Sequence, residues 1–304
     1  MHLLTLKDWS GEQIADMVDL GISVKGHPEG YASHLKDKTL AMVFQKTSTR
    51  TRCAFEVGMT QLGGHGIYLD WRTTNFIMAD VRDESKVLSR YADLIMARLL
   101  KHADLRAMAE GSEVPVINGC CEKYHPCQAL GDLMTVKEVE GRLEGVRLVY
   151  VGIHNNVCNS LIAGCTNVGM EITVVAPEMN EPSRDESLLD AARATGLYKT
   201  TLDLEGAAKR ADIVYTDTWV DMEFFLDPKF EQEKQRRIKT FKPYQLNKAL
   251  LEGSDARVMH CMPAHRGYEI TEDVVEAPRS ILFDQAENRM HVQKALMMRL
   301  LGKA

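Results

Sequence analysis

The feature that most constrains this chain is a run of hydroxyl and guanidinium side chains, Lys-Thr-Ser-Thr-Arg-Thr-Arg over residues 46–52, between a predicted strand and a predicted helix. The apolar segment 39–44 is typical of a buried strand, and the apolar positions of 54–62 recur at helical spacing. A helix N-terminus offers unpaired N–H groups and the positive end of the helix dipole, and arginine adds a planar fork that matches phosphate oxygens. The junction therefore predicts a binding site for a phosphate dianion.

The alternative is an ordinary helix cap followed by a solvated basic turn. Serine and threonine are common at caps, so either hydroxyl alone would fit this alternative. Two arginines interleaved with four hydroxyls exceed what capping requires, and this favours the phosphate site.

Predicted strands alternate with predicted helices along the whole chain. Because such alternation produces parallel sheets with right-handed crossovers, the sequence predicts an α/β fold of two doubly wound parallel-sheet domains. The alternation restarts after Gly141, so the domains are expected at 1–140 and 141–285, with an active-site cleft between them. The further predicted strands are 67–70, 94–97, 114–118, 146–151, 171–176, 213–215 and 258–263, and the main predicted helices are 12–24, 83–92, 126–139, 158–168, 183–195, 229–241 and about 286–301.

Composition excludes several classes of protein. At 304 residues the chain can form two domains with substantial cores, and its formal net charge of −6 argues against a nucleic-acid surface. No apolar segment approaches the length of a membrane span, and the N-terminus lacks a signal-peptide pattern. Seven cysteines, an odd number without a Cys-x-x-Cys pair, favour reduced thiols over a disulfide framework or a zinc site. We therefore expect a soluble cytoplasmic protein without a metal site.

Three further side chains stand where parallel-sheet proteins present ligand-binding groups. Arg98 ends a predicted strand, although an ordinary surface arginine would also fit there. His125 and Gln128 stand at the entry of the helix that begins at Pro126, three residues apart and on one face. A histidine can donate to a carbonyl oxygen and a glutamine can accept from an amide NH2, so both can contact one small polar molecule. A His-Pro pair by itself is usually a helix cap.

Residues 150–157, Tyr-Val-Gly-Ile-His-Asn-Asn-Val, follow a predicted strand as a dinucleotide-binding loop would. The segment lacks the Gly-x-Gly-x-x-Gly pattern, which argues against a nicotinamide-dependent oxidoreductase. We therefore expect no nucleotide cofactor.

The predicted phosphate site and the segments that contain Arg98, His125 and Gln128 resemble elements of the aspartate/ornithine carbamoyltransferase family. Residues 44–52 resemble its carbamoyl-phosphate motif, and 95–98 resemble its strand that ends in a functional arginine. Residues 125–128 match the family's His-Pro-x-Gln element, which binds the carbamoyl group.

Segments in the second half extend the resemblance to nearly the whole chain. Residues 152–156 resemble the family's Gly-Asp-x-Asn-Asn segment, with Ile153 where Asp is usual, and 217–220 resemble the acceptor loop of ornithine enzymes. Residues 260–267, His-Cys-Met-Pro-Ala-His-Arg-Gly, resemble the ornithine-type signature rather than the aspartate-type one. Residues 286–289 match the start of the family's last helix.

The resemblance implies a transferase that moves the carbamoyl group of carbamoyl phosphate to the side-chain amine of ornithine or a related diamino acid and releases phosphate, without cofactor or metal. It implies that residues 1–140 bind carbamoyl phosphate, that 141–285 bind the acceptor, and that the helix 286–304 packs back on the first domain. The implied catalytic residues are Arg50, Arg98, His125 and Cys261. The implied carbamoyl-phosphate ligands are Ser48, Thr49, Arg50, Thr51, Arg98, His125, Gln128, Cys261, Met262, Arg289 and His65, and the implied acceptor ligands are Asn156, Asp217, Asp221 and Met222.

The resemblance also implies a homotrimer that acts in amino-acid and arginine metabolism. His65 and the loop 71–80 would complete the site of a neighbouring subunit. Phe76, Ile77 and Met78 in this loop are costly if exposed, which fits burial at a subunit junction.

Two acceptor-facing segments depart from the family pattern. Ornithine enzymes usually continue the acceptor loop with Ser-Met-Gly, whereas this chain has Asp221, Met222 and Glu223, and segment 73–80 also differs. Extra carboxylates would repel an α-carboxylate and attract an ammonium, unless both point to solvent. One alternative is therefore a carbamoyltransferase for another acceptor, such as 2,4-diaminobutyrate, putrescine or another diamine. The other is a non-catalytic relative that binds carbamoyl phosphate, although the intact donor residues weigh against it.

Overall fold

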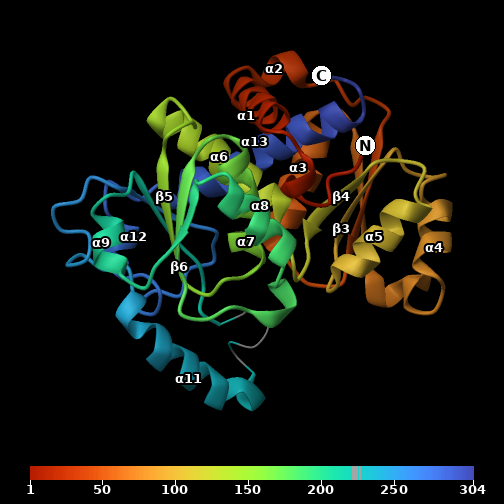
Figure 1. Cartoon of the computed structure of the whole chain (residues 1–304). Helices are drawn as coiled ribbons and strands as arrows, with labels where there is room; N and C mark the ends of the chain where they lie inside the picture. The colour runs from red at the N-terminus through yellow and green to blue at the C-terminus, as the bar shows by residue number, and fades with distance from the viewer. Residues whose placement is uncertain (221–224, 226) are drawn as a thin grey trace.

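The computed structural model describes residues 1–220, 225 and 227–304, which form two parallel β-sheets flanked by helices (Figure 1). The first sheet has the strand order β2-β1-β3-β4 and the second has the order β7-β6-β5-β8-β9. All neighbouring strands in both sheets run parallel, as the alternation of the sequence predicts. The strands are β1 (Thr39–Phe44), β2 (His65–Asp70), β3 (Leu94–Arg98), β4 (Val116–Cys120), β5 (Arg147–Val151), β6 (Glu171–Val175), β7 (Tyr198–Thr200), β8 (Ile213–Thr216) and β9 (Arg257–His260).

In each sheet the chain adds strands on both sides of the first strand, which is characteristic of a doubly wound fold. In the first sheet β2 and β3 lie on opposite sides of β1, and in the second sheet β6 and β8 lie on opposite sides of β5. Loops that leave such neighbouring strands diverge, so a crevice forms at the carboxyl ends of β1 and β3 and of β5 and β8. The central strands are buried over nearly their whole length, since helices cover both faces of each sheet.

Helices cover the sheets, and none of those in the described residues has the length and apolar character needed to cross a membrane. The helix predicted from residue 183 begins only at Glu186, because the side chain of Asp185 caps it by accepting from the Leu188 N–H. The short elements β7, α9 and α12 are not predicted from the sequence, since three to five residues carry too little periodicity. The α-helices are α1 (Gly11–Gly26), α2 (Pro28–Tyr31), α3 (Thr49–Gln61), α4 (Val81–Leu88), α5 (His102–Gly111), α6 (Pro126–Glu140), α7 (Asn156–Asn167), α8 (Glu186–Ala194), α9 (Leu204–Ala208), α11 (Glu231–Phe241), α12 (Glu272–Val275) and α13 (Leu282–Leu300). Single 3₁₀ turns are η1 (Leu6–Asp8), η2 (Trp71–Thr73), η3 (Asn75–Ile77), η4 (Glu181–Ser183), η5 (Pro228–Phe230) and η6 (Lys242–Tyr244).

One apolar core joins the two sheets. Buried side chains form a continuous cluster from Ile95 in β3 through Leu133 in α6 to Met259 in β9. The long helix α13 packs against α1, α3, α6 and β9, and Figure 1 shows it beside α1 and α6 between the sheets. Helix α6 is buried over residues 126–136, and it ends at Gly141, whose φ of 72° is the left-handed conformation that glycine tolerates. The two walls of the cleft are therefore held in place by packed helices.

The loop expected at a subunit junction is only partly exposed. Phe76 stacks on Trp71 with ring centroids 4.9 Å apart and is 6% exposed, so this ring is buried within its own chain. Ile77 and Met78 are 56% and 77% exposed. The cost of exposure that the sequence suggests for this loop therefore applies to Ile77 and Met78 and not to Phe76.

Helices α6 and α13 lie close together at Gly131, where an added methyl group would be tightly packed against the backbone of α13. A Cβ there would lie 3.0 Å from Cγ and 3.2 Å from Cα of Arg289. We expect Gly131→Ala to lower the free energy of unfolding by about 1–3 kcal/mol, since overpacked cores are destabilised by this amount. Equilibrium urea unfolding measures the change.

The matched control is Gly26→Ala, because a Cβ at Gly26, in the last turn of α1, meets no atom within 4 Å. This change should leave the free energy of unfolding within about 1 kcal/mol of the parent or raise it, since alanine is the better helix former. Equal effects of the two substitutions would contradict the close approach of the helices.

Candidate functional site

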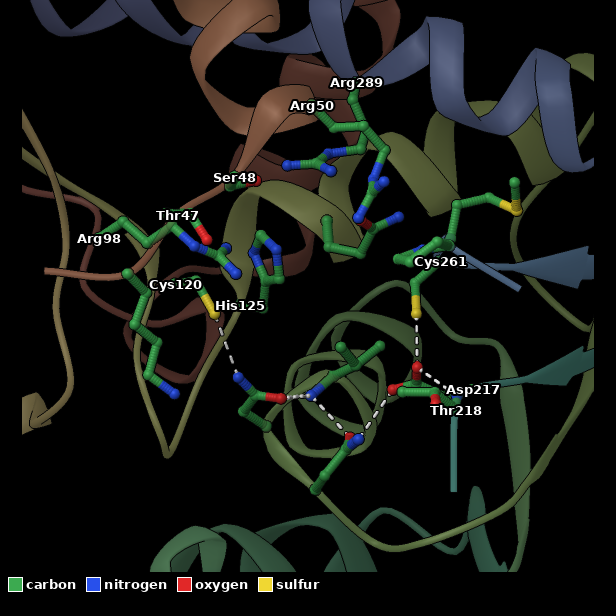
Figure 2. A pocket seen from close by; sticks show the side chains of 17 residues that line it. Thr47, Ser48, Arg50, Arg98, Cys120, His125, Asp217, Thr218, Cys261 and Arg289 are labelled. Carbon is green, nitrogen blue, oxygen red and sulfur yellow. Dashed lines mark hydrogen bonds between the residues drawn. The ribbon is translucent and has the colours of Figure 1, made fainter. Parts of the chain in front are cut away.

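The main cleft lies where the carboxyl ends of the strands of both sheets meet (Figure 2). Its volume is about 230 Å³, which lies below the range of about 300–1,000 Å³ of drug-sized pockets and suits small metabolites. The first half of the chain contributes Lys46, Thr47, Ser48, Arg50, Arg98, Cys120, His125 and Gln128; the second contributes Asn155, Asn156, Val157, Asp217, Thr218, Cys261, Met262 and Pro263; and α13 contributes Arg289.

The N-terminus of α3 faces the cleft, as the sequence predicts for a phosphate site. Ser48 is the N-cap: its Oγ accepts from the Thr51 N–H at 3.2 Å and donates to Thr51 Oγ1 at 3.0 Å. Thr51 is fully buried behind the cleft, where its hydroxyl also accepts from Arg289 Nη2 at 3.1 Å. The cap therefore fixes both the helix start and one arginine of the wall.

Three guanidinium groups from three separate elements converge on this end of the cleft. Arg50 is in α3, Arg98 ends β3 and Arg289 is in α13. Burial, together with the charge of Arg98, lowers the pKa of Arg50, and burial with the charges of Arg98 and Arg50 lowers the pKa of Arg289. The Nε atoms of Arg98 and Arg289 are buried without a hydrogen-bond acceptor among the described residues. Like charges so close favour a multiply charged anion between them.

His125 and Gln128 lie at the first turn of α6, beside the arginines. The backbone N–H of His125 donates to Ser160 Oγ at 2.7 Å, which fixes the helix entry. Burial and then the charges of Arg289, Arg98 and Arg50 lower the pKa of His125 well below its usual value, so the ring is neutral at pH 7. Its Nδ1 is buried without a partner among the described residues. A neutral imidazole offers one N–H donor to a ligand.

The opposite end of the cleft centres on Asp217, after the end of β8. Its Oδ2 accepts from Asn155 Nδ2 at 2.7 Å, and its Oδ1 accepts from the Thr218 N–H at 2.7 Å and from Cys261 Sγ at 2.8 Å. Burial and the neighbouring Asp217 raise the pKa of Cys261 well above its usual value. Cys261 is therefore a neutral thiol that donates a hydrogen bond, and thiolate nucleophilicity is suppressed.

Asn156 turns its side chain toward β4. Its Nδ2 donates to the backbone oxygen of Cys121 at 2.5 Å and to Cys120 Sγ at 3.3 Å. The neighbouring Asn155 caps α7 by accepting from the N–H groups of Val157 and Cys158. The two asparagines therefore connect the end of β4 in the first half with Asp217 in the second.

The loop after β9 carries Met262 in an unusual backbone conformation. Met262 has a φ of 55°, and the Met262–Pro263 peptide bond is cis. The buried ring of His260 holds this turn: its Nδ1 accepts from the Met262 N–H at 2.8 Å, and its Nε2 contacts Glu269 Oε1 at 3.0 Å. A non-glycine residue with positive φ persists only where the surroundings fix it, as this buried pair does.

Most residues predicted from the sequence meet in this cleft, with stated exceptions. Thr49 is exposed outside the lining, Thr51 lies behind it, and His65 is exposed on the edge strand β2. Asp221 and Met222 lie outside the described residues. The seven lining residues that sequence reasoning missed as ligands are Lys46, Thr47, Cys120, Asn155, Val157, Thr218 and Pro263. All but Cys120 lie in or next to the predicted motifs, so extending each motif to its neighbours would have found them, whereas Cys120 follows the predicted strand 114–118 and belongs to no such motif.

A metal centre has no counterpart in the part of the chain that the structure describes, because no three His, Cys, Asp or Glu side chains cluster there. The polar side chains that line the cleft carry guanidinium, ammonium, imidazole, amide, hydroxyl, carboxylate and thiol groups.

Comparison with known families gives two matches that together span nearly the whole chain. Residues 1–138 match the aspartate/ornithine carbamoyltransferase carbamoyl-P binding domain, and residues 144–300 match the Asp/Orn binding domain of the same family. The arginine-rich end of the cleft comes mainly from the first of these segments, and Asp217 and Cys261 come from the second.

Individual relatives agree with this assignment. The ornithine carbamoyltransferase of Pyrococcus horikoshii is 43% identical, over 99% of this chain and 95% of its own length. The structure of ornithine carbamoyltransferase from Pyrococcus furiosus superposes with a TM-score of 0.91 at 41% identity, over 99% of this chain and 97% of that one. A structure of N-acetyl-L-ornithine transcarbamylase gives 0.85 at 30% identity, over 99% of both chains. This chain therefore belongs to the aspartate/ornithine carbamoyltransferase family.

Proposed function

We propose that this protein transfers the carbamoyl group of carbamoyl phosphate to the side-chain amine of ornithine and releases phosphate. The observation that carries the proposal is the pairing of two unlike ends in one cleft. Three arginines and a neutral histidine form one end, and a carboxylate hydrogen-bonded to a thiol forms the other. A dianionic donor and a cationic amino-acid acceptor would be complementary to these two ends.

At the donor end, Arg50 and the N-terminus of α3 at Ser48 hold the phosphate group and favour its departure. Arg98 and the N–H of neutral His125 stabilise the oxyanion that forms when the amine attacks the carbamoyl carbon. Gln128 and the backbone carbonyls near Cys261 orient the carbamoyl NH2 group. Thr49 is exposed and contributes as the first residue of α3. Thr51 is buried and contributes by accepting a hydrogen bond from Arg289.

At the acceptor end, Asp217 and Asn156 hold the α-ammonium group of the amino acid, and Cys261 lies beside the reacting amine. The amine forms a C–N bond to the carbamoyl carbon, the C–O bond to phosphate breaks, and the departing phosphate takes the amine proton. The amine of ornithine has a free pKa of about 10.4, so the neutral form costs about 1.4 kcal/mol per pH unit below it. Desolvation and the nearby guanidiniums both favour the neutral amine.

The two domains are assigned to the two substrates in the same way. We propose that residues 1–140, with the helix 286–304, form the carbamoyl-phosphate domain and that 141–285 form the acceptor domain. A cytoplasmic location is part of the proposal, supported by seven cysteines that are all free thiols.

A homotrimer completes the proposal, because one predicted donor ligand lies outside the cleft of its own chain. His65 is exposed on β2 and is absent from the cleft lining. Ile77 and Met78, at 56% and 77% exposed, lie in the following loop and form part of an apolar surface. Burial of this surface against a neighbour would bring His65 to the neighbour's arginine cluster.

The first test replaces Arg50 with alanine. Loss of a charge-assisted contact to phosphate should cost about 2–4 kcal/mol, so we expect kcat/KM for carbamoyl phosphate to fall roughly 30- to 1,000-fold. The matched control is Arg52→Ala, in the same helical turn. Arg52 is exposed, donates to Glu56 at 2.8 Å and stacks over Tyr68, so its loss should change kcat/KM by less than about threefold. Equal values for the two variants would remove Arg50 from the site.

The second test concerns the acceptor, because Asp221 and Glu223 depart from the usual sequence and one structural relative is named for N-acetyl-L-ornithine. We expect ornithine to exceed 2,3-diaminopropionate, 2,4-diaminobutyrate, lysine and putrescine in kcat/KM by about a hundredfold, a gap of about 2.7 kcal/mol. Phosphate release with each amine gives the ranking. A shorter diamino acid or putrescine in first place would establish the altered-acceptor alternative instead.

The third test concerns shared sites. If His65 completes a neighbouring cleft, mixed trimers of Arg50→Ala and His65→Ala subunits contain some clefts with both residues intact. We expect denaturation and co-refolding of the two inactive variants to restore activity, up to roughly a quarter of the parental value on random assembly. Refolding each variant alone is the control. Full activity in a particle of monomer mass by light scattering would refute the trimer.

A further inference from the structure

Asp132 is a buried carboxylate on α6, behind the cleft. It accepts hydrogen bonds from side chains of three different elements. Its Oδ1 accepts from Gln128 Nε2 at 2.8 Å and from Gln285 Nε2 at 2.7 Å, and its Oδ2 accepts from the Tyr215 hydroxyl at 3.1 Å. These donors belong to α6, α13 and β8. Asp132 itself is 0% exposed. Its partners Gln285 and Tyr215 are likewise fully buried, and nothing in the proposed chemistry uses Asp132 directly.

An ionised carboxylate can only accept hydrogen bonds, and this fixes how Gln128 is oriented. The side-chain amide of Gln128 has one donor end and one acceptor end. Because Asp132 requires the NH2 end, the carbonyl Oε1 is left for the cleft, which Gln128 lines. We propose that Asp132 is a positioning residue that holds the Gln128 carbonyl toward the carbamoyl NH2 of the donor. This inference rests on the function proposed above, and it assigns the orientation of one of its ligands.

The buried charge is costly, so its presence calls for an explanation. Burial raises the pKa of Asp132 to about 6, although hydrogen bonds from Gln128, Gln285 and Tyr215 and the charge of Arg289 act in the opposite direction. Its two oxygens nevertheless accept from three donors, which is the pattern that an ionised carboxylate takes. An apolar side chain at the same place would avoid the desolvation cost, and it would leave the Gln128 amide free to turn over.

Hydrogen bonds through Gln285 and Tyr215 also connect Asp132 with the acceptor end of the cleft. Gln285, which donates to Asp132, accepts from the backbone N–H of His260 at 2.8 Å, next to Cys261. Tyr215 lies in β8, two residues before Asp217. One rigid set of hydrogen bonds therefore connects the Gln128 amide with the strand ends that carry the acceptor-side carboxylate and thiol.

Kinetics separate positioning from a merely structural role. Asp132→Ala removes the acceptor and should lower kcat/KM for carbamoyl phosphate about 30-fold or more at saturating ornithine. Asp132→Asn keeps one oxygen toward Gln128 and Gln285 and turns its NH2 toward the Tyr215 oxygen, so it should recover to within about fivefold of the parent.

The matched control is Thr135→Val, one turn further along α6. Thr135 is equally buried and binds α13, since its hydroxyl accepts from Asn288 Nδ2 at 3.0 Å, but it does not contact Gln128. Its loss should lower the melting temperature while kcat/KM stays within about threefold of the parent. A drop for Thr135→Val as large as that for Asp132→Ala would overturn the inference.

A double-mutant cycle with Gln128→Ala gives the decisive readout. If Asp132 acts through Gln128, adding Asp132→Ala to Gln128→Ala should lower kcat/KM by less than about threefold more. An equal loss in both backgrounds, parental activity of Asp132→Ala, or an Asp132→Asn variant as poor as Asp132→Ala would each overturn the inference.

A direct measurement covers the case in which Asp132→Ala fails to fold. In the unaltered protein labelled with ¹⁵N at glutamine side chains, the Gln128 NH2 signal is assigned by its loss in Gln128→Ala. An NH2 group turned toward Asp132 should exchange with solvent slowly, and one turned toward the cleft should exchange fast. Fast exchange overturns the orientation whether or not the protein turns over ornithine, whereas absence of turnover in the unaltered protein would instead overturn the proposed function.

Discussion

Repulsion among the three guanidiniums of Arg50, Arg98 and Arg289 is the constraint on which the rest of the structure depends. Burial and mutual repulsion act together to lower the pKa of Arg50 and of Arg289. Charges of one sign stay this close only where a rigid scaffold holds them, and their electrostatic energy falls when an anion enters between them. The free cleft is thus preorganised for a dianion and need not reorganise when charge develops in the reaction.

Each of the three arginines belongs to a different element, and each element is held in place by its own packing. The start of α3 is fixed by the Ser48 cap, Arg98 follows from the end of a buried parallel strand, and Arg289 is fixed by the packing of α13 on α6 at Gly131. Because α13 packs on both halves of the chain, the same helix that supplies an arginine also holds the two sheets together. Displacing α13 would therefore relax the repulsion and open the cleft at once, which couples folding stability to the geometry of the anion site.

The sequence predicts the fold well, and it predicts most of the side chains that meet at the arginine-rich end of the cleft, for a physical reason. Parallel strands are continuous apolar runs, and ligands at their carboxyl ends directly follow these runs, so motifs such as 46–52 and 125–128 are local in sequence. What the sequence does not predict depends on long-range packing. Thr51 turns inward to hold Arg289, Phe76 is buried on Trp71, and Asn155 rather than its neighbour holds Asp217. Each outcome is decided by a tertiary contact or by the direction of one side chain. The periodicity of the sequence gives no information about either.

The protonation states of the cleft follow from the same charge distribution. The arginines keep His125 neutral, so the ring offers a donor without adding a fourth positive charge that would oppose an incoming ammonium. At the other end, Asp217 keeps Cys261 protonated, so the thiol donates a hydrogen bond to the carboxylate and its sulfur carries no charge. The cleft therefore has one positive and one negative end. In the proposed reaction, an acceptor with an ammonium group at each end is drawn to Asp217 by one of them. Its other amine then faces the arginines, where the neutral, nucleophilic form is favoured. In this proposal, the positive charge that binds the donor also promotes deprotonation of the acceptor, and a separate protein base is not required for that step.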